Sequence, residues 1–116
     1  MNRKFRLIRS TDFKRVRRLG QSYAHPLIVL IRHPNDMEIS RFGIIAGRSI
    51  GNAVRRNRAK RRIREIIRPI LSIILPGWDI ILLARKPIMK ASFEEISSAT
   101  FTLLERADLL NELDDD

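Results

Sequence analysis

Apolar residues recur along this chain in two kinds of pattern. At helical spacing they predict three helices, over residues 11–19, residues 52–68, and from residue 92 to about residue 110. In short continuous runs they predict three buried strands, over residues 26–32, 41–46 and 78–84. A further short strand near Ser22 fits the same pattern. The predicted order of elements is therefore α-β-β-(β)-α-β-α.

Turn and cap residues bound these elements. Turn-forming residues at 34–36 predict that the strand at residues 41–46 pairs back against the strand before it. Asn52 is a good N-cap for the second helix, and Pro69 should end or kink that helix. Ser92 and Glu95 form a capping box for the last helix. Together these elements predict an α+β domain with a single, mostly antiparallel sheet packed by helices.

Length and cysteine content narrow the class of protein. With 116 residues the chain predicts one domain, with its core within about residues 5–110. No cysteine is present, so disulfides and thiolate metal sites are excluded, which is compatible with a reducing cytosol. The longest apolar run is far below the roughly 20 residues that span a bilayer, and the N-terminus lacks the apolar core of a signal peptide. We therefore expect a cytoplasmic protein that does not bind membranes.

The formal net charge of +10 combines two unlike parts of the chain. Residues 1–90 contain 22 of the 23 Lys and Arg but only five of the 13 acids, a net charge of +17. Residues 91–116 carry a net charge of −7 and end in an acidic tail at residues 111–116. Arginine, which grips phosphate through two parallel hydrogen bonds, supplies 18 of the 23 basic residues. Because counterion release favours binding to polyanions, nucleic acid is the expected partner.

The charge is densest in the second predicted helix. Seven basic residues and no acid lie between Arg55 and Arg64. With about 100° of rotation per residue, the apolar face comprises Ala59, Ile63, Ile66, Ile67 and Ile70. The opposite face carries Arg58, Arg61, Arg64 and Arg68. In the first turns basic residues surround the whole axis, so we expect those turns to project from the domain into a phosphate-lined groove.

The same segment is also recognisable as a motif. Arg56-Asn57-Arg58, preceded by IGNAV and followed by Lys60, Arg61 and Arg64, resembles the RNR signature of the bacterial ribonuclease P protein family. Residues 11–20, 41–43 and 80–87 resemble the first helix, the sheet and the last strand of that family. The resemblance covers about residues 5–107.

The resemblance implies a function and a topology. The chain would be the protein subunit of ribonuclease P, which removes the 5′ leader of precursor tRNA endonucleolytically to give the mature tRNA 5′ end. Catalysis would belong to the RNA subunit and its Mg²⁺, so the protein alone would supply no catalytic residue, metal site or cofactor. The expected partners are the catalytic RNA subunit and precursor tRNA, with no obligate protein partner. The family also has a left-handed crossover through the basic helix, against the usual right-handed rule.

The resemblance further implies two sets of binding residues. Contacts to the RNA subunit would come from Arg56, Asn57, Arg58, Lys60, Arg61, Arg64 and Arg68. A cleft between the first helix and the sheet would take the single-stranded leader, with Phe13, Arg17, Ile31, Arg48 and Lys86 along it. Arg17 and Ile31 stand where many relatives have aromatic residues, which removes two stacking platforms of roughly 1–3 kcal/mol per base.

Other functions fit the residues less well. A free-standing protein nuclease would need an acid/base or metal constellation, whereas His25, His33, Asp12, Asp36 and Glu38 form none in the sequence and are expected at the surface. No second helix precedes the basic one closely enough for a helix-turn-helix. A membrane-surface helix would need the apolar face that the sheet requires. A general RNA-binding or ribosome-associated protein would share the charge and the fold, and only the RNR pattern argues against it.

Overall fold

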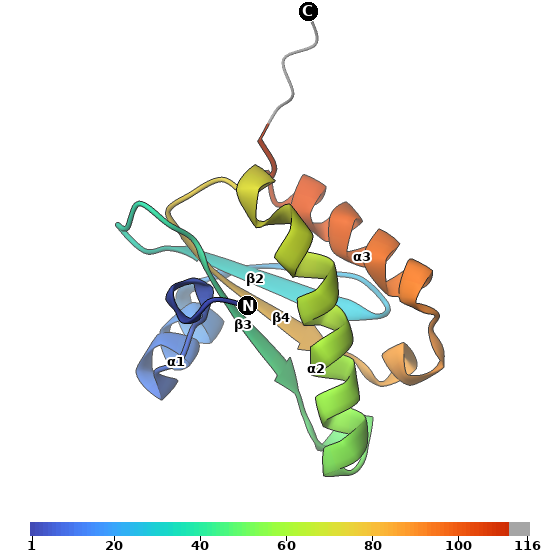
Figure 1. Cartoon of the computed structure of the whole chain (residues 1–116). Helices are drawn as coiled ribbons and strands as arrows, with labels where there is room; N and C mark the ends of the chain where they lie inside the picture. Colours follow the sequence, from blue (N-terminus) through green and yellow to red (C-terminus); the bar gives the residue numbers. More distant parts are fainter. Residues whose placement is uncertain (112–116) are drawn as a thin grey trace, which may run out of the picture.

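The computed structural model describes residues 1–111, in which helices cover both faces of a four-stranded sheet (Figure 1). The strands are β1 (Gln21–Ala24), β2 (Ile28–Pro34), β3 (Arg41–Ala46) and β4 (Trp78–Ala84). Helices α2 (Ala53–Ile67) and α3 (Phe93–Arg106) lie on one face, and α1 (Ser10–Leu19) lies on the other. The α+β class, the element order and the short strand near Ser22 are therefore confirmed. The acidic tail at residues 112–116 lies outside the described residues.

The strand order across the sheet is β1-β2-β4-β3. The β1–β2 and β2–β4 pairs are antiparallel, while β3 and β4 are parallel neighbours that α2 connects. The expectation that β3 pairs back against β2 is wrong, because β4 lies between them. Ile80, Ile81 and Leu82 of β4 have no exposed surface, so the middle of this apolar strand is covered on both faces. The left-handed sense of the crossover stays a prediction of the resemblance.

The sheet divides the apolar residues into two layers. Alternate residues of each strand point to opposite faces, so Leu30 and Leu82 pack under α2 and α3 while Ile31 and Ile81 pack under α1. The layer under α2 and α3 is the larger one and forms the main core. The layer under α1 is small, since α1 is short and covers only part of its face.

Local sequence explains where α2 begins and ends. Gly51 has φ of 127°, a conformation that favours glycine, and it directs the chain into the N-cap Asn52. The Asn52 side chain accepts a hydrogen bond from the backbone N–H of Arg55 at 3.0 Å. The helix ends at Ile67, two residues before Pro69, and a 3-10 turn follows over Arg68–Ile73. The predicted cap and stop are confirmed.

Helix α3 has the predicted capping box, with hydrogen bonds in both directions between Ser92 and Glu95. It ends at Arg106, earlier than predicted, because Asp108 adopts a left-handed φ of 53° and turns the chain. Leu110 then forms an isolated bridge with Ile74 rather than a further helical turn. Across residues 1–111, no helix is long and apolar enough to cross a membrane.

A candidate nucleic-acid interface

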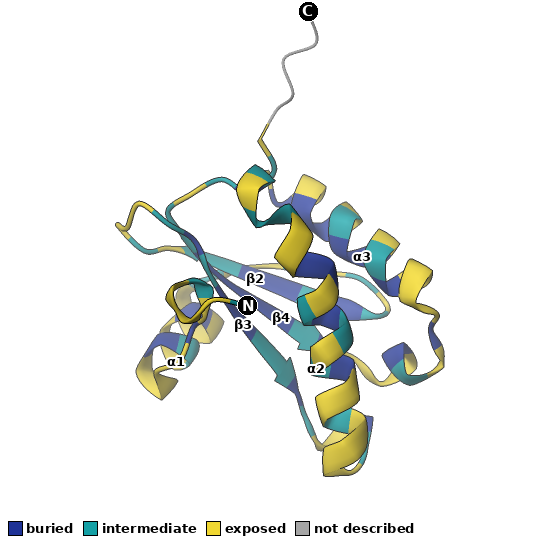
Figure 2. Cartoon of the chain, in the orientation of Figure 1, coloured by how far each residue is buried: buried dark blue, intermediate teal, exposed yellow. Residues whose placement is uncertain are grey.

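The first turns of α2 project from the domain as predicted. No residue of α2 is buried before Ala59, and Val54 is 76% exposed. From Ala59 onward one side of α2 is buried against the sheet (Figure 2). Ile63 and Ile67 are fully buried there. The helix is therefore anchored by its second half and offers its first half to solvent.

The predicted RNA-binding residues of α2 and of its C-cap, which we call the α2 basic surface, run from this projecting end along the helix to Arg68. They are Arg56, Asn57, Arg58, Lys60, Arg61, Arg64 and Arg68. Four of them are exposed, namely Asn57, Arg58, Arg61 and Arg68. The other three, Arg56, Lys60 and Arg64, are half-buried along one flank of the helix. All seven polar groups thus reach solvent.

No acid neutralises the α2 basic surface within residues 1–111. Each of the ion pairs in this part of the chain involves Asp12 or Asp79, which lie on other elements. Glu65, the only acid in α2, is exposed and makes none of them. Arg62 differs from its neighbours because its Nη1 donates to the Ala91 carbonyl at 3.2 Å and so ties α2 to the start of α3. Sequence pattern alone does not separate Arg62 from the free arginines.

The face of the sheet under α1 has an uncovered row of small and apolar residues, which we call the open row. It consists of Ala24, Val29, Leu83 and Ile45, one from each strand and paired directly across the sheet. Directly paired residues point to the same face, and Val29 and Ile45 pack at the margin of the layer beneath α1. Because three of these side chains are half-buried and Ala24 is exposed, the row forms a shallow apolar floor beside α1.

The row next to it is covered by α1. Phe13 lies so close to Gly43 that a Cβ on that glycine would stand 2.4 Å from the ring, so only glycine fits there. Ile31 is 6% exposed and packs with Val16 and Ile81 beneath the helix. This corrects the assignment of Ile31 to the cleft, because its side chain belongs to the core. Val29, two residues earlier on the same face, lies in the open row instead, and local sequence pattern does not indicate which of the two residues α1 covers.

The other predicted cleft residues surround the open row. Phe13 is half-buried, and Arg17 is exposed four residues later on the same side of α1. Arg48 and Lys86 are exposed and follow the carboxyl ends of β3 and β4. Because those strands are parallel neighbours, both basic residues lie at one edge of the sheet. A leader-binding role for these residues stays a prediction.

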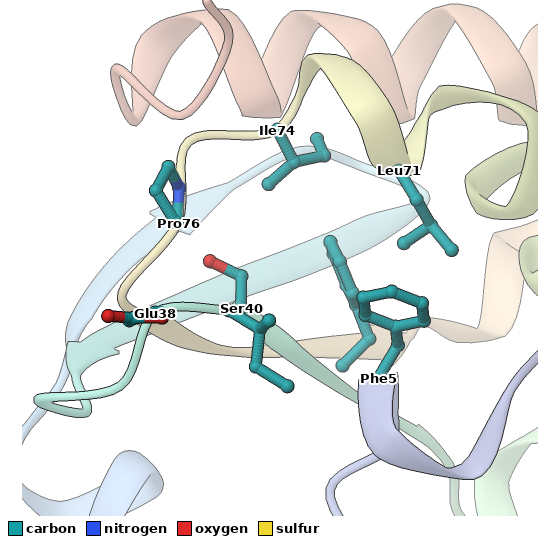
Figure 3. A pocket seen from close by; sticks show the side chains of 8 residues that line it. Phe5, Glu38, Ser40, Leu71, Ile74 and Pro76 are labelled. Carbon is teal, nitrogen blue, oxygen red and sulfur yellow. The ribbon is translucent and has the colours of Figure 1, made fainter.

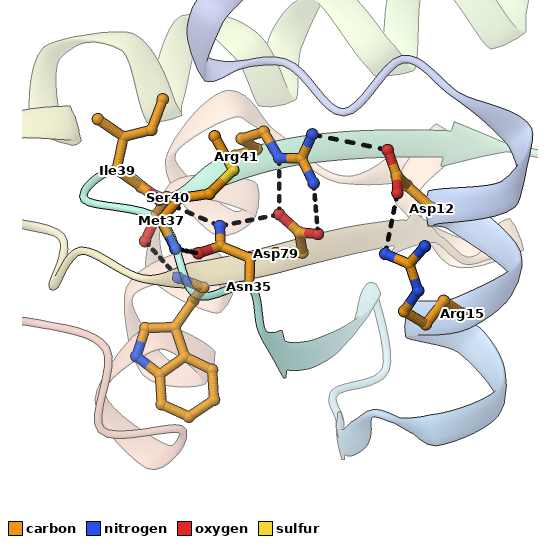
Figure 4. A network of polar contacts seen from close by, with 9 residues as sticks. Asp12, Arg15, Asn35, Met37, Ile39, Ser40, Arg41 and Asp79 are labelled. Carbon is orange, nitrogen blue, oxygen red and sulfur yellow. Dashed lines mark hydrogen bonds and ion pairs between the residues drawn. The ribbon is translucent and has the colours of Figure 1, made fainter.

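A network of ion pairs centred on Arg41 links β3 to β4 through Asp79 and to α1 through Asp12 (Figure 4). Arg41 donates to both carboxylate oxygens of Asp79, at 2.9 and 2.8 Å, and these hydrogen bonds raise the pKa of Arg41 despite its partial burial. The Asp12 carboxylate lies 3.6 Å from Arg41 and 3.0 Å from Arg15. Asp12 is only 7% exposed, so its expected place at the surface is wrong. The two arginines at its oxygens explain how the carboxylate is tolerated there.

The remaining candidate acids and histidines do not gather into a site. Asp36 and Glu38 are exposed on the loop that joins β2 and β3. The Nδ1 atom of His25 accepts a hydrogen bond from the Leu27 N–H at 3.0 Å, so this ring stabilises a turn. Among residues 1–111, no group of three or more His, Asp or Glu side chains lies close enough to hold a metal ion.

A small hollow opens on the main-core side of the sheet, between β3 and the 3-10 turn at Arg68–Ile73 (Figure 3). Phe5, Leu71, Ile74 and Pro76 line it, together with the polar side chain of Ser40. Its volume is about 130 Å³, below the range of about 300–1,000 Å³ typical of ligand sites. No basic residue lines it, so it offers nothing to a phosphate.

Comparisons with known proteins agree with one another. A family model described as Ribonuclease P matches residues 1–108. A ribonuclease P protein component from Herpetosiphon aurantiacus is 42% identical over 109 residues, which cover 94% of this chain and 89% of the relative. The Staphylococcus aureus RNase P protein structure superposes with a TM-score of 0.85 at 33% identity, covering 92% of this chain and 98% of that one. The structure of the Thermotoga maritima RNase P protein superposes with a TM-score of 0.80 at 33% identity, covering 87% of this chain and 96% of that one.

Proposed function

This chain belongs to the bacterial ribonuclease P protein family, and from that membership we propose how its surfaces divide the work of binding RNA. The chain is a protein subunit of an endoribonuclease, with a role in maturing the 5′ end of tRNA. The α2 basic surface binds the catalytic RNA subunit, and the open row with its basic margin receives the 5′ leader of precursor tRNA. Hydrolysis of the phosphodiester is carried out by the RNA subunit.

The observation that carries the first assignment is the unneutralised charge of α2. Arg58, Arg61 and Arg68 are exposed and take part in no ion pair or side-chain hydrogen bond within residues 1–111. Arginine in this state binds phosphate in a bidentate way without first losing a protein partner. A helix end with basic residues on all sides fits a groove between phosphate backbones better than a flat surface.

The leader assignment rests on the combination of an apolar floor and a basic margin. Proteins that bind single strands stack bases on aromatic side chains and hold phosphates with nearby cations. Here Val29, Leu83 and Ile45 supply the floor, and Phe13 supplies one aromatic edge. Arg17, Arg48 and Lys86 supply the cations. Because the floor is aliphatic, stacking is weaker than on aromatic rings, and leader binding depends more on phosphate contacts.

The ribonucleoprotein requires Mg²⁺, which we assign to the RNA. Asp12 and Asp79, the buried acids of the described chain, already bind arginines. The protein therefore contributes charge and positioning: its arginines neutralise phosphates that would otherwise repel one another where two RNA molecules meet. We also propose that residues 1–116 act as one cytoplasmic RNA-binding domain that needs no other protein partner.

The test is cleavage of precursor tRNA at low Mg²⁺ by a bacterial ribonuclease P RNA, alone and with this protein. We expect strong stimulation with the correct 5′ end, and no cleavage by the protein without RNA. Binding without stimulation would indicate a general RNA-binding protein instead. Cleavage by the protein alone would contradict the assignment of hydrolysis to the RNA.

A further inference from the structure

A second concave surface lies on the far side of α1 from the open row. One wall is the N-terminal segment at residues 3–9, and the opposite wall is the loop between β2 and β3. Asp12 and Arg41 lie between the two walls. Arg41 and Ile45 lie on the same strand, about 13 Å apart at 3.3 Å per residue, with the row covered by α1 between them. This cavity, which we call the N-terminal pocket, is therefore separate from the proposed leader cleft.

The N-terminal pocket has the size of a ligand site. Its volume is about 390 Å³, within the range of about 300–1,000 Å³ found for small-molecule pockets. A hollow of about 340 Å³ also lies along α1, between Thr11 and Leu19, but all its lining residues come from that one helix. Three separate segments build the N-terminal pocket, which makes it a concave site rather than a groove on a helix surface.

The rim of the pocket is positively charged and unneutralised. Four basic residues of the N-terminal segment line it, namely Arg3, Lys4, Arg6 and Arg9. Asp12 is the only acid that lines it, and both Asp12 oxygens already face arginines, Oδ1 at 3.0 Å from Arg15 and Oδ2 at 3.6 Å from Arg41. The net charge of the rim therefore favours an anion.

The walls of the pocket are apolar although they are exposed. Ile8 is 52% exposed and Met37 is 42% exposed, and both line the pocket together with the half-buried Ile39. Single exposed apolar residues are common on proteins. Two large ones within a single basic cavity form a combination that suits a ligand with a flat apolar part and a negative charge. An unpaired nucleotide, with a base and phosphates, has these two features.

The wall that carries Met37 is held in place before any ligand binds (Figure 4). Asn35 accepts a hydrogen bond from the Met37 N–H at 2.8 Å and donates to the Ile39 carbonyl at 3.1 Å. The Asn35 amide also donates to Asp79 at 3.0 Å, and Asp79 is bound by Arg41. The loop is thus tied to the buried ion pairs, so a ligand would meet a wall that is already ordered.

The pocket also adjoins the α2 basic surface. Arg6 forms an isolated parallel bridge with Phe42 at the free edge of β3, and it lines the pocket. Helix α2 packs against β3, the strand that Arg6 borders, so Arg6 lies on the α2 side of the pocket. In agreement, burial lowers the pKa of Arg64 in α2, and the positive charge of Arg6 lowers it further. An RNA strand bound along α2 would therefore reach the pocket through Arg6.

We propose that the N-terminal pocket holds one unpaired nucleotide of the catalytic RNA subunit, with its base between Ile8 and Met37 and its phosphates on Arg3, Arg6 and Arg9. This inference rests on the proposed function for its choice of RNA. RNA is read by proteins mainly where bases are unpaired and splayed out of a helix. Apolar side chains on both sides of such a base replace the stacking that the base loses.

Site-specific crosslinking tests the occupant directly. Because the chain contains no cysteine, a Met37→Cys variant carries a single thiol for a photoactivatable azidophenyl group. Leu19→Cys is the matched control, since Leu19 is a 58% exposed apolar residue in the basic hollow along α1. With ribonuclease P RNA and precursor tRNA both present, we expect position 37 to crosslink to one short unpaired stretch of the RNA subunit, and position 19 not to share that product.

Affinity measurements supply a second readout. Ile8→Ser and Met37→Ser should each weaken binding of the RNA subunit about fivefold, given the known contribution of base stacking, while Leu19→Ser should leave it unchanged. Arg3→Ala should make the salt dependence shallower by about one unit of log–log slope. Melting temperatures of all variants should match the parent, because the substituted side chains are exposed.

Three outcomes would overturn the inference: crosslinks from position 37 to precursor tRNA, crosslinks no different from those of position 19, or unchanged affinity of both serine variants. If the parent protein stimulates cleavage while these variants behave like it, only the pocket assignment fails. If the parent does not stimulate cleavage but position 37 still crosslinks to one RNA-subunit stretch, the proposed function fails and the pocket assignment stands.

Discussion

Helices α2 and α3 pack against each other on the same face of the sheet, but they begin in opposite ways. The first turn of α3 carries Glu94 and Glu95, and the hydrogen bonds from Ser92 lower the pKa of Glu95. Acids at a helix N-terminus interact favourably with the helix dipole. The first turn of α2 has no acid and is followed at once by arginines, which interact unfavourably with the same dipole.

The two helices also differ in how much of their length is buried. In α3 the first buried residue is Ile96, in the first turn, and burial continues to Leu104. In α2 burial begins only at Ala59, after a turn and a half of exposed or half-buried residues. The comparison teaches that α3 is buried along most of its length and so stabilises the fold, whereas the first half of α2 keeps its charges in solvent, where the proposed RNA contact would use them.

The largest expected effect comes from a core substitution in α3, which should lower stability without changing RNA binding. Leu103 is fully buried in the main core, so Leu103→Ala should lower the free energy of unfolding by about 2–5 kcal/mol. Urea denaturation followed by circular dichroism measures the loss. RNA-subunit affinity, measured where the variant is still folded, should match that of the parent. A loss of affinity in folded protein would show that α3 takes part in binding.

The next largest effect comes from a surface substitution in α2, which should weaken RNA binding without changing stability. Arg61→Ala should weaken RNA-subunit binding about tenfold, since a charge-assisted contact of this kind is worth about 1.4 kcal/mol. The melting temperature should stay unchanged because Arg61 is exposed. If the protein neutralises about six phosphates, the plot of log binding constant against log salt concentration should have a slope near −4 on single strands and a steeper slope on duplex. The slope for Arg61→Ala should be shallower by about one.

Two controls sharpen that measurement. Arg58→Ala should behave like Arg61→Ala, because both side chains are exposed and unpaired. Glu65→Gln, on the same helix, should bind slightly more tightly, because it removes the one acid of α2. Unchanged affinity of both arginine variants together with a lower melting temperature would contradict the binding role and assign these residues to stability.

A third pair of variants compares the caps of the two helices. Asn52→Ala and Ser92→Ala each remove a side-chain oxygen that accepts from the helix backbone, so each should cost about 1 kcal/mol of stability. Only Asn52→Ala should also weaken RNA binding, because it frays the turn that positions the first arginines. Calorimetry and filter binding on both variants measure this. Equal losses of affinity would mean that binding follows overall stability.

The smallest expected effect comes from a substitution in α2 that should raise stability and weaken RNA binding. Val54 is 76% exposed in the first turn of α2, and Val54→Glu would give that turn the acid that α3 has. We expect about 0.3–1 kcal/mol of added stability from the helix dipole, with weaker RNA binding from the added negative charge. Thermal denaturation and RNA titration in the same buffer measure both changes. A variant that gained stability without losing affinity would contradict the trade-off.

Sequence reasoning succeeded where a local signal determines the structure. Asn52 and Pro69 bound α2 because capping and the missing proline N–H act within one turn. The strand β4 was predicted with its observed bounds because a buried strand needs a continuous apolar run. The projecting end of α2 followed from its lack of an apolar face. In each case the residues that decide the structure are neighbours in the chain.

The failures concern contacts between distant segments. The turn at residues 34–36 favoured a β2–β3 hairpin, but the pairing energy depends on β4, which lies more than 30 residues further along the chain. From the sequence alone Asp12 is expected at the surface, because only the fold places Arg41 beside it. Ile31 and Val29 lie on the same face of one strand, and only the position of α1 decides which one is covered. These outcomes depend on how elements pack, which local pattern does not determine.

The central place of β4 has a consequence for the order of synthesis. A ribosome makes α1, β1, β2, β3 and α2 before it reaches Trp78, so β2 has only β1 beside it and β3 has no neighbouring strand while the basic helix is already complete. The sheet closes only when the last third of the chain emerges. Until then the nascent chain carries its arginines, with no platform beneath them, beside a particle rich in RNA. We therefore expect folding of the sheet and non-specific capture by that RNA to compete for the same segment during translation.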